Sequence, residues 1–169
     1  TYKGDIYTVP VAGGRAMQIT TNPAYDTAPV WSPDSKRIAF ASDRMGSLDV
    51  YIVAKDGGEP RRLTTHSGSE TPLAFTDAGH VLFSAGIMPS AEAVVFPSNG
   101  QFNQVYRVSV EGGRPTMISS MPMECISINK EGAMLYQDKK GYEDYWRKHH
   151  VSPIARDIWM YTPGKEPQY

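Results

Sequence analysis

The sequence predicts an all-β protein, and three observations lead to this prediction. Apolar residues alternate with polar ones over short stretches such as "RIAFAS" at residues 37–42, the pattern of a half-buried strand. No long segment has the 3.6-residue periodicity of a helix. The 15 glycines and 13 prolines are spread along the chain, as expected for many short strands joined by tight turns.

A repeated hairpin organises these strands. Three segments begin with a polar, a β-branched and an aromatic residue: "DIYTVPVAGGRAMQIT" at Asp5, "DVYIVAKDGGEPRRLT" at Asp49 and "QVYRVSVEGGRPTMIS" at Gln104. A fourth, "DIWMYTPGKEPQY", begins at Asp157. In the first three, a Gly-Gly pair falls eight and nine residues after the first residue. Glycine adopts the positive φ of a tight hairpin turn, so each segment is predicted to form two antiparallel strands.

A second pair of strands lies between these hairpins. It is clearest in "APVWSPDSKRIAFASD" at residues 28–43, where a turn at residues 33–36 separates two apolar stretches. Weaker copies occupy residues 73–85 and 126–138. The unit is therefore four antiparallel strands, recurring after 44, 55 and 53 residues. Such a unit is the blade of a β-propeller.

The repeat divides one predicted domain, residues 1–169, into about three blades and a leading half blade. Residues 1–20 would supply the third and fourth strands of a first blade, 21–64 a second blade, 65–119 a third, and 120–169 a fourth without its last strand. A closed ring needs roughly four to eight blades, so we expect a fragment of a larger protein or one part of an assembled ring. Open blade edges predict self-association.

Composition limits the other function classes. Lys and Arg total 17 against 18 Asp and Glu, so no global charge favours nucleic acid or an anionic membrane as a partner. No apolar run has the length of a membrane span. The single cysteine, Cys125, excludes an internal disulfide, and its place in "MECISI" predicts packing in the core. The sequence predicts no metal and no cofactor.

No residue pattern nominates a catalytic centre. Asp34 and Asp43 flank a strand, but their positions in the repeat favour turn residues that bond the backbone over an acid–base pair. His66 and His80 are isolated and are expected to be solvated. No serine has the setting of a nucleophile beside a histidine.

Two long loops are the candidate binding region. The loop between the second and third strands is short in the second blade, but "GIMPSAEAVVFPSNGQF" (86–102) and "KKGYEDYWRKHHVSPIAR" (139–156) are about twelve residues longer. Such loops emerge on one face of a propeller, and long loops on a rigid scaffold often bind ligands. The candidate binding residues are Trp146, Arg147, Lys148, His149, His150 and Arg156.

Several interpretations of the basic loop remain open. It can be a structural loop whose arginines pair with local acids, or a contact for a peptide or a neighbouring domain, since Arg binds a carboxylate in bidentate geometry. Nucleic-acid binding is a minor alternative, because the chain is neutral overall. A metal site at His149 and His150 is disfavoured, because adjacent side chains on an extended backbone point to opposite faces.

The signature "P.WSPDSKRIAFASDR.G..DVYIV...GGEPRRLT" at residues 29–64 resembles the propeller repeat shared by TolB, the Tricorn protease and the prolyl oligopeptidase relatives. Within that group the whole chain is similar to the N-terminal propeller region of Tricorn-like serine proteases. The resemblance implies a six-bladed propeller that precedes a second propeller, a PDZ domain and the protease core. The catalytic Ser, His and Glu of that family lie in a C-terminal half with no counterpart here.

The resemblance implies a non-catalytic segment of a serine peptidase that serves substrate access or filtering, domain docking or assembly. Its expected partners are the other blades and protease domains of the parent chain, and a peptide substrate. The parent would be cytoplasmic. The alternative is a TolB-like interaction scaffold of the cell envelope, which would be periplasmic. A prolyl oligopeptidase relative, with an α/β-hydrolase domain downstream, is a third interpretation.

Overall fold

The computed structural model describes residues 1–86, 103–121, 123–129, 131–138, 157–162 and 164–165. Every element in this part of the chain is a β-strand, which confirms the all-β prediction. The same residues include no helix that is long and apolar enough to span a membrane.

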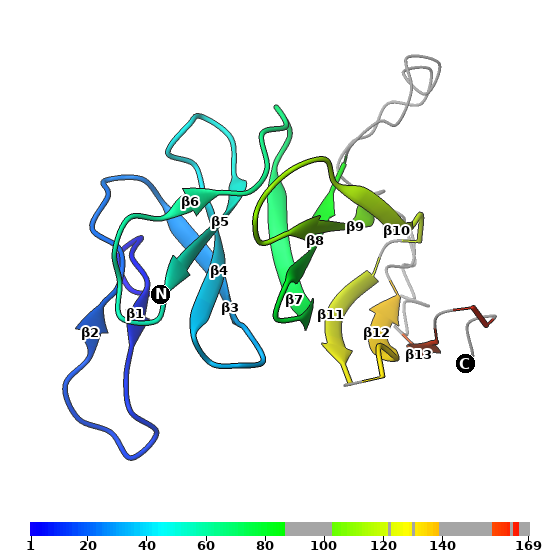
Figure 1. Ribbon diagram of the computed structural model, residues 1–169, viewed down its shortest axis with the longest axis horizontal. Helices are drawn as coiled ribbons and strands as arrows, with labels where there is room; N and C mark the ends of the chain where they lie inside the picture. Colours follow the sequence, from blue (N-terminus) through cyan, green and yellow to red (C-terminus); the bar gives the residue numbers. More distant parts are fainter. Residues whose placement is uncertain (87–102, 122, 130, 139–156, 163, 166–169) are drawn as a thin grey trace, which may run out of the picture.

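The strands form four antiparallel sheets that follow one another in chain order (Figure 1). The first sheet contains β1 (Tyr7–Thr8) and β2 (Met17–Gln18). The second contains β3 (Asp26–Trp31), β4 (Arg37–Ser42), β5 (Asp49–Ala54) and β6 (Arg61–Arg62). The third contains β7 (Glu70–Asp77), β8 (His80–Ala85), β9 (Gln104–Ser109) and β10 (Thr116–Ser119). The fourth contains β11 (Met123–Ile128), β12 (Met134–Asp138) and β13 (Ile158–Tyr161).

Each strand pairs with the next strand in sequence, so each sheet is an up-and-down meander. Two of the sheets have the four antiparallel strands that the repeat predicts. Together with the two-stranded and three-stranded sheets at the ends, they form a partial β-propeller.

Two aspartates and a Gly-Gly pair stabilise the connections of the second sheet. The backbone N–H of Lys36 donates to Asp34 Oδ1 at 3.1 Å, and the Ser32 hydroxyl donates to the same oxygen. The backbone N–H of Tyr25 donates to Asp43 Oδ1 at 2.8 Å. Both aspartates therefore bond the backbone, as predicted. Gly57 and Gly58 have φ angles of +90° and +114° in the turn after β5, which is why glycine is needed there.

The central strands are buried on both faces. In β4, Ile38 and Phe40 pack in a cluster with Ile6 and Ile19 of the first sheet's hairpin. Ala39, between them in sequence, packs instead in a cluster shared with the third sheet. Because alternate residues of a strand point to opposite faces, one strand supplies two interfaces. This two-sided burial accounts for the continuous apolar runs in the sequence.

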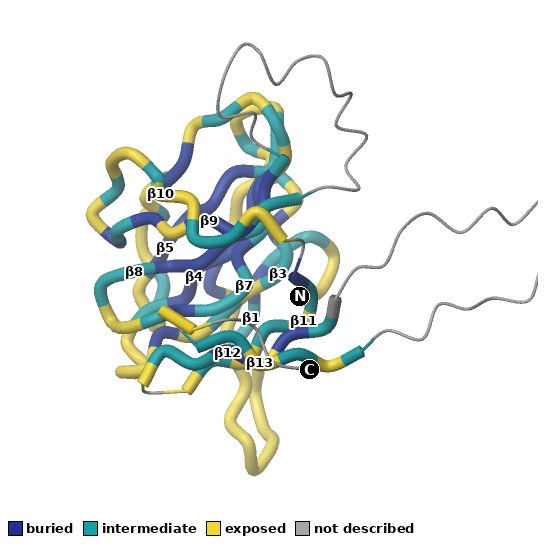
Figure 2. The backbone as a smooth tube through the Cα atoms, turned by 90° about the vertical axis from the view of Figure 1, so that its right-hand side faces the viewer, coloured by how far each residue is buried: buried dark blue, intermediate teal, exposed yellow. Residues whose placement is uncertain are grey.

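Similar clusters join the remaining sheets. The second and third sheets share the cluster that contains Val50, Ile52, Phe83 and Val108. The third and fourth share one that contains Leu82, Val105, Met123, Met134 and Tyr136. The buried residues are accordingly concentrated in the central strands of the sheets (Figure 2).

The first strands of successive sheets lie side by side. Strand β7 contacts β3 on one side and β11 on the other (Figure 1). The second, third and fourth sheets therefore meet along their first strands, as the blades of a propeller do around its axis.

The prediction for Cys125 is wrong. Its side chain is exposed, and its φ of +52° accompanies a break in the β11–β12 register between Glu124 and Ser127. Such a bulge interrupts the alternation of inward and outward side chains. Met123, two residues earlier, occupies the core instead.

Candidate functional site

Apart from Gly86, the two long loops predicted as a binding region lie outside the described residues. They connect β8 to β9 and β12 to β13, the second and third strands of their sheets. The candidate binding residues Trp146, Arg147, Lys148, His149, His150 and Arg156 all belong to the second of these loops. Their role stays a prediction.

The corresponding connection in the second sheet, between β4 and β5, is described and carries Arg44. Its Nε donates to Ser42 Oγ at 2.9 Å, and its Nη2 lies 3.1 and 3.2 Å from the two carboxylate oxygens of Asp26. The Asp26 side chain is completely buried and that of Arg44 is 11% exposed. The guanidinium therefore balances a carboxylate that has no access to water.

Two aromatic rings also contact the same guanidinium. Its central carbon lies 4.6 Å from the ring centroid of Tyr51 and 5.6 Å from that of Phe40, which are cation–π distances. Burial raises the pKa of the Tyr51 hydroxyl, so this ring stays neutral. Arg44 is thus fixed by contacts with Ser42, Asp26 and the two aromatic rings.

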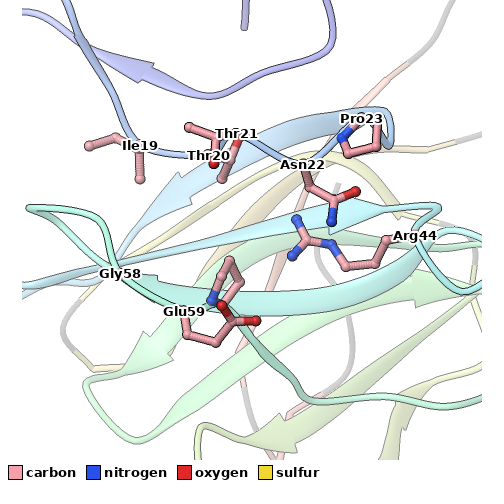
Figure 3. A pocket seen from close by; sticks show the side chains of 9 residues that line it. Ile19, Thr20, Thr21, Asn22, Pro23, Arg44, Gly58 and Glu59 are labelled. Atoms are coloured by element: carbon pink, nitrogen blue, oxygen red, sulfur yellow. The ribbon is translucent and has the colours of Figure 1, made fainter.

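A cavity of about 240 Å³ opens beside Arg44. Figure 3 shows the guanidinium lying between Asn22 and Glu59. The cavity is lined by Ile19, Thr20, Thr21, Asn22, Pro23, Arg44, Gly58, Glu59 and Pro60. Hydroxyl, amide, guanidinium and carboxylate groups at its wall can hydrogen-bond water or a small polar molecule.

The described residues do not form a hydrolytic centre. His66 Nδ1 accepts the backbone N–H of Gly68 at 3.0 Å, and His80 Nδ1 lies 3.0 Å from Asp77. Neither ring is hydrogen-bonded to a serine hydroxyl in this part of the chain, whereas a serine nucleophile needs such a base. No group of three or more His, Cys, Asp and Glu side chains that could hold a metal occurs there either.

Polar residues recur where successive sheets meet. The backbone N–H of Ile6 donates to Thr20 Oγ1 at 3.0 Å, and that of Val50 donates to Thr64 Oγ1 at 2.9 Å. In each junction an acidic residue begins the first strand of the next sheet, at Asp26 and Glu70.

The buried acids Asp26 and Glu70 were not predicted from the sequence. Asp26 follows Asp5 by 21 residues, and Glu70 follows Asp49 by the same distance. That shared spacing is the signal that could have identified them. It does not reveal burial, which arises only when the sheets pack.

The last sheet exposes an apolar face. Leu135, Ile158 and Met160 are 50, 71 and 39% exposed. By strand register and by the repeat, they occupy the positions of Ala39, Val50 and Ile52 in the second sheet, which are 0, 0 and 5% exposed. These positions are buried in the second sheet because a third sheet covers them.

The stacked meanders define a segment of a β-propeller. The model of one family, described as the Tricorn protease N-terminal beta propeller domain, matches residues 1–168. The chain belongs to this family.

The chain is also similar to individual proteins of the Tricorn and TolB types. Tricorn protease homolog 1 of Streptomyces coelicolor is 24% identical over 161 residues, 95% of this chain and 14% of the relative. The Tol-Pal system protein TolB of Bordetella pertussis is 44% identical over 55 residues, 32% of this chain and 13% of that protein. The structure of a putative TolB from Agrobacterium tumefaciens has a TM-score of 0.68 at 22% identity, and covers 97% of this chain and 55% of that one. The chain thus spans only a small part of the curated relatives it matches.

Proposed function

We propose that this chain is a non-catalytic propeller segment of a Tricorn-like serine peptidase, serving substrate access or filtering, domain docking or assembly for a protease core elsewhere in the parent protein. The observation that carries this proposal is the match to the Tricorn N-terminal propeller family over residues 1–168. The parent would be a cytoplasmic hydrolase, and the segment itself would not cleave peptides.

The exposed face of the fourth sheet supports a docking role. Leu135, Ile158 and Met160 form an apolar surface at positions that the second sheet buries against its neighbour. A surface of this kind fits another blade. In this proposal the four sheets belong to blades at residues 1–20, 21–64, 65–119 and 120–169, and further blades of the parent cover the open face.

The partners follow from the same surfaces. Other blades and the protease domains of the parent would contact the open sheet faces, and a peptide substrate would meet the face that carries the long loops. We assign no role in nucleic-acid or membrane binding. An isolated chain with an uncovered apolar face is expected to associate with a second copy of itself.

An activity assay tests the non-catalytic part of the proposal. The purified 169-residue chain is incubated with fluorogenic peptides and with a fluorophosphonate that labels activated serines. We expect no turnover and no labelling, because the described histidines activate no serine. Peptidase activity that stays with the chain through successive purification steps would refute it.

The neighbouring coding sequence tests the assignment to a peptidase. A PDZ domain and a serine protease core encoded after residue 169 would support it. A stop after one closed ring would instead favour the second candidate, a TolB-like periplasmic interaction scaffold without protease activity. The 44% identity to the Bordetella pertussis TolB over 55 residues and the fold shared with a putative TolB favour this second candidate.

A further inference from the structure

Two buried carboxyl groups share one cation where the second and third sheets meet. The side chains of Asp49 and Glu70 are completely buried. Arg62 Nη2 lies 2.8 Å from Asp49 Oδ2, and the Arg62 side chain is 28% exposed. Within the described residues, no oxygen of either carboxyl group has a hydrogen-bond partner of good geometry, although the Thr64 hydroxyl lies near enough to Glu70 to lower the pKa of that side chain. One positive charge therefore faces two groups that could each be negative.

The equivalent position in the preceding junction is built differently. There Asp26 has its own guanidinium, because Arg44 contacts both of its oxygens. Glu70 has no such contact among the described residues. Its neighbours across the sheet are uncharged: Ala85 pairs with Glu70, and Gln104 pairs with Ala85.

A proton can take the place of the missing guanidinium. Burial raises the pKa of Glu70 to about 7, and the charge of Asp49 adds to the rise, while the Thr64 hydroxyl and Arg62 oppose it. The charged groups that act on Glu70 are thus Asp49 on β5 and Arg62 on β6. A protonated Glu70 leaves the single cation to Asp49 and places no second charge in the interface.

Glu70 also lies where the two sheets are joined by backbone. Its N–H donates to the carbonyl oxygen of Leu48 at 2.7 Å, which links the start of β7 to the residue before β5. An ionised carboxylate at this point is costly, because the Glu70 side chain is completely buried in the closed joint and has no contact with water.

We propose that the junction between the β3–β6 sheet and the β7–β10 sheet is a protonation-dependent joint, closed while Glu70 holds a proton and opened more readily when that proton is lost. The joint makes the docking of successive blades tighter in acidic than in alkaline solution. This role does not depend on whether the parent protein is a peptidase.

The direction of the pH dependence follows from the thermodynamic linkage between proton binding and opening of the joint. The closed joint binds the proton of Glu70 more tightly than the open joint, where the pKa of the side chain returns to its ordinary value of 4.5. The stabilising contribution is therefore fully present below about pH 4.5 and is lost as the pH rises through about 7. The opening equilibrium should rise roughly fortyfold from pH 5 to pH 7 and less than about twofold from pH 7 to pH 8.

Hydrogen exchange of the full chain measures this opening. Deuterium uptake in β5, β6 and β7 is followed at pH 5, 7 and 8 and corrected for the intrinsic exchange rate. We expect the fortyfold rise in the unchanged chain and none in Glu70→Gln, whose side chain does not titrate. Glu131→Gln makes the same chemical change at an exposed position and should keep the rise. Equal pH dependence in the unchanged chain and Glu70→Gln would overturn the proposal.

Two further measurements keep the proposal testable if Glu70→Gln does not fold. Asp49→Asn removes the second negative charge and so lowers the pKa of Glu70 in the closed joint; the rise should become smaller and level off at a lower pH. In the unchanged chain, the infrared band of a protonated carboxylic acid should persist at pH 6 and disappear with a midpoint near 7. A rise that stays in place in Asp49→Asn, or no protonated carboxyl group at pH 6, would refute the joint.

Discussion

At the residue scale, Asp26 and Arg44 form a buried ion pair whose two charges depend on each other. The carboxylate is completely buried, and the guanidinium that balances it is held by Ser42 and lies over Tyr51. Removing one partner of such a pair leaves an uncompensated charge in the interior, which costs far more than the intact pair contributes.

We therefore expect Arg44→Gln to lower the free energy of unfolding by about 3–5 kcal/mol at pH 7. Urea denaturation followed by tryptophan fluorescence and circular dichroism measures the loss. Lys55→Gln is the control, because Lys55 pairs with Asp56 on the surface, where both side chains are more than half exposed. The control should change stability by no more than about 1 kcal/mol. A similar small effect of Arg44→Gln would show that Asp26 finds another source of compensation.

At this scale, local chemistry was predictable from sequence and burial was not. Asp34 was correctly predicted as a turn residue, because its hydrogen bond to Lys36 involves only neighbours in the chain. The exposure of Cys125 was not predicted, because the bulge that exposes its side chain depends on how β11 pairs with β12. The burial of Glu70 likewise depends on packing between two sheets.

At the scale of the strand, one aromatic pair recurs from sheet to sheet. Phe40 on β4 stacks with Tyr51 on β5, with ring centroids 6.0 Å apart. Phe83 on β8 stacks with Tyr106 on β9 in the same register, at 5.6 Å. Both phenylalanines are completely buried, so each fills the interface between its sheet and the sheet before it.

Truncation of either phenylalanine should therefore have a similar cost. We expect Phe40→Ala and Phe83→Ala each to lower the free energy of unfolding by about 3–5 kcal/mol, through lost burial and the cavity left behind. Trp31→Ala is the control, because Trp31 on β3 is 50% exposed and should cost much less. The measurement is again urea denaturation. A cost for Trp31→Ala equal to that of Phe40→Ala would contradict the assignment of the buried face.

The repeat made the hairpins predictable at this scale. The Gly-Gly pairs and the shared spacing placed the turns, including the one where Gly57 and Gly58 have positive φ. The two-sided burial of β4 and β5 could not be read in the same way, because an apolar run does not show which residues face which neighbour.

At the scale of the whole molecule, the repeat predicted the class of fold. A sheet that recurs along the chain can bury the two faces of its central strands only by packing against neighbouring copies of itself. The middle sheets have those neighbours, and their central strands are buried. The repeat did not predict the conformation of the candidate binding loop. Residues 139–156 interrupt the repeat, so no equivalent segment indicates their conformation, and they lie outside the described residues.

The uncovered face of the last sheet leads to a prediction about assembly. Leu135 and Ile158 lie on β12 and β13 at positions that are buried in the second sheet. Exposed apolar surface of this kind favours association with a second copy. We expect the isolated chain to self-associate, and the double variant Leu135→Lys with Ile158→Lys to shift it toward the monomer, as measured by light scattering over a range of concentrations.

A charge at these two positions should act on association and not on folding, because neither side chain contributes to the described core clusters. The free energy of unfolding should therefore change by no more than about 0.5 kcal/mol per substitution. Met45→Lys is the control, since Met45 is 66% exposed in the connection between β4 and β5, away from this face. If Met45→Lys disperses the chain as well as the double variant does, or if the unchanged chain is a monomer at all concentrations, the fourth sheet is not the surface of association.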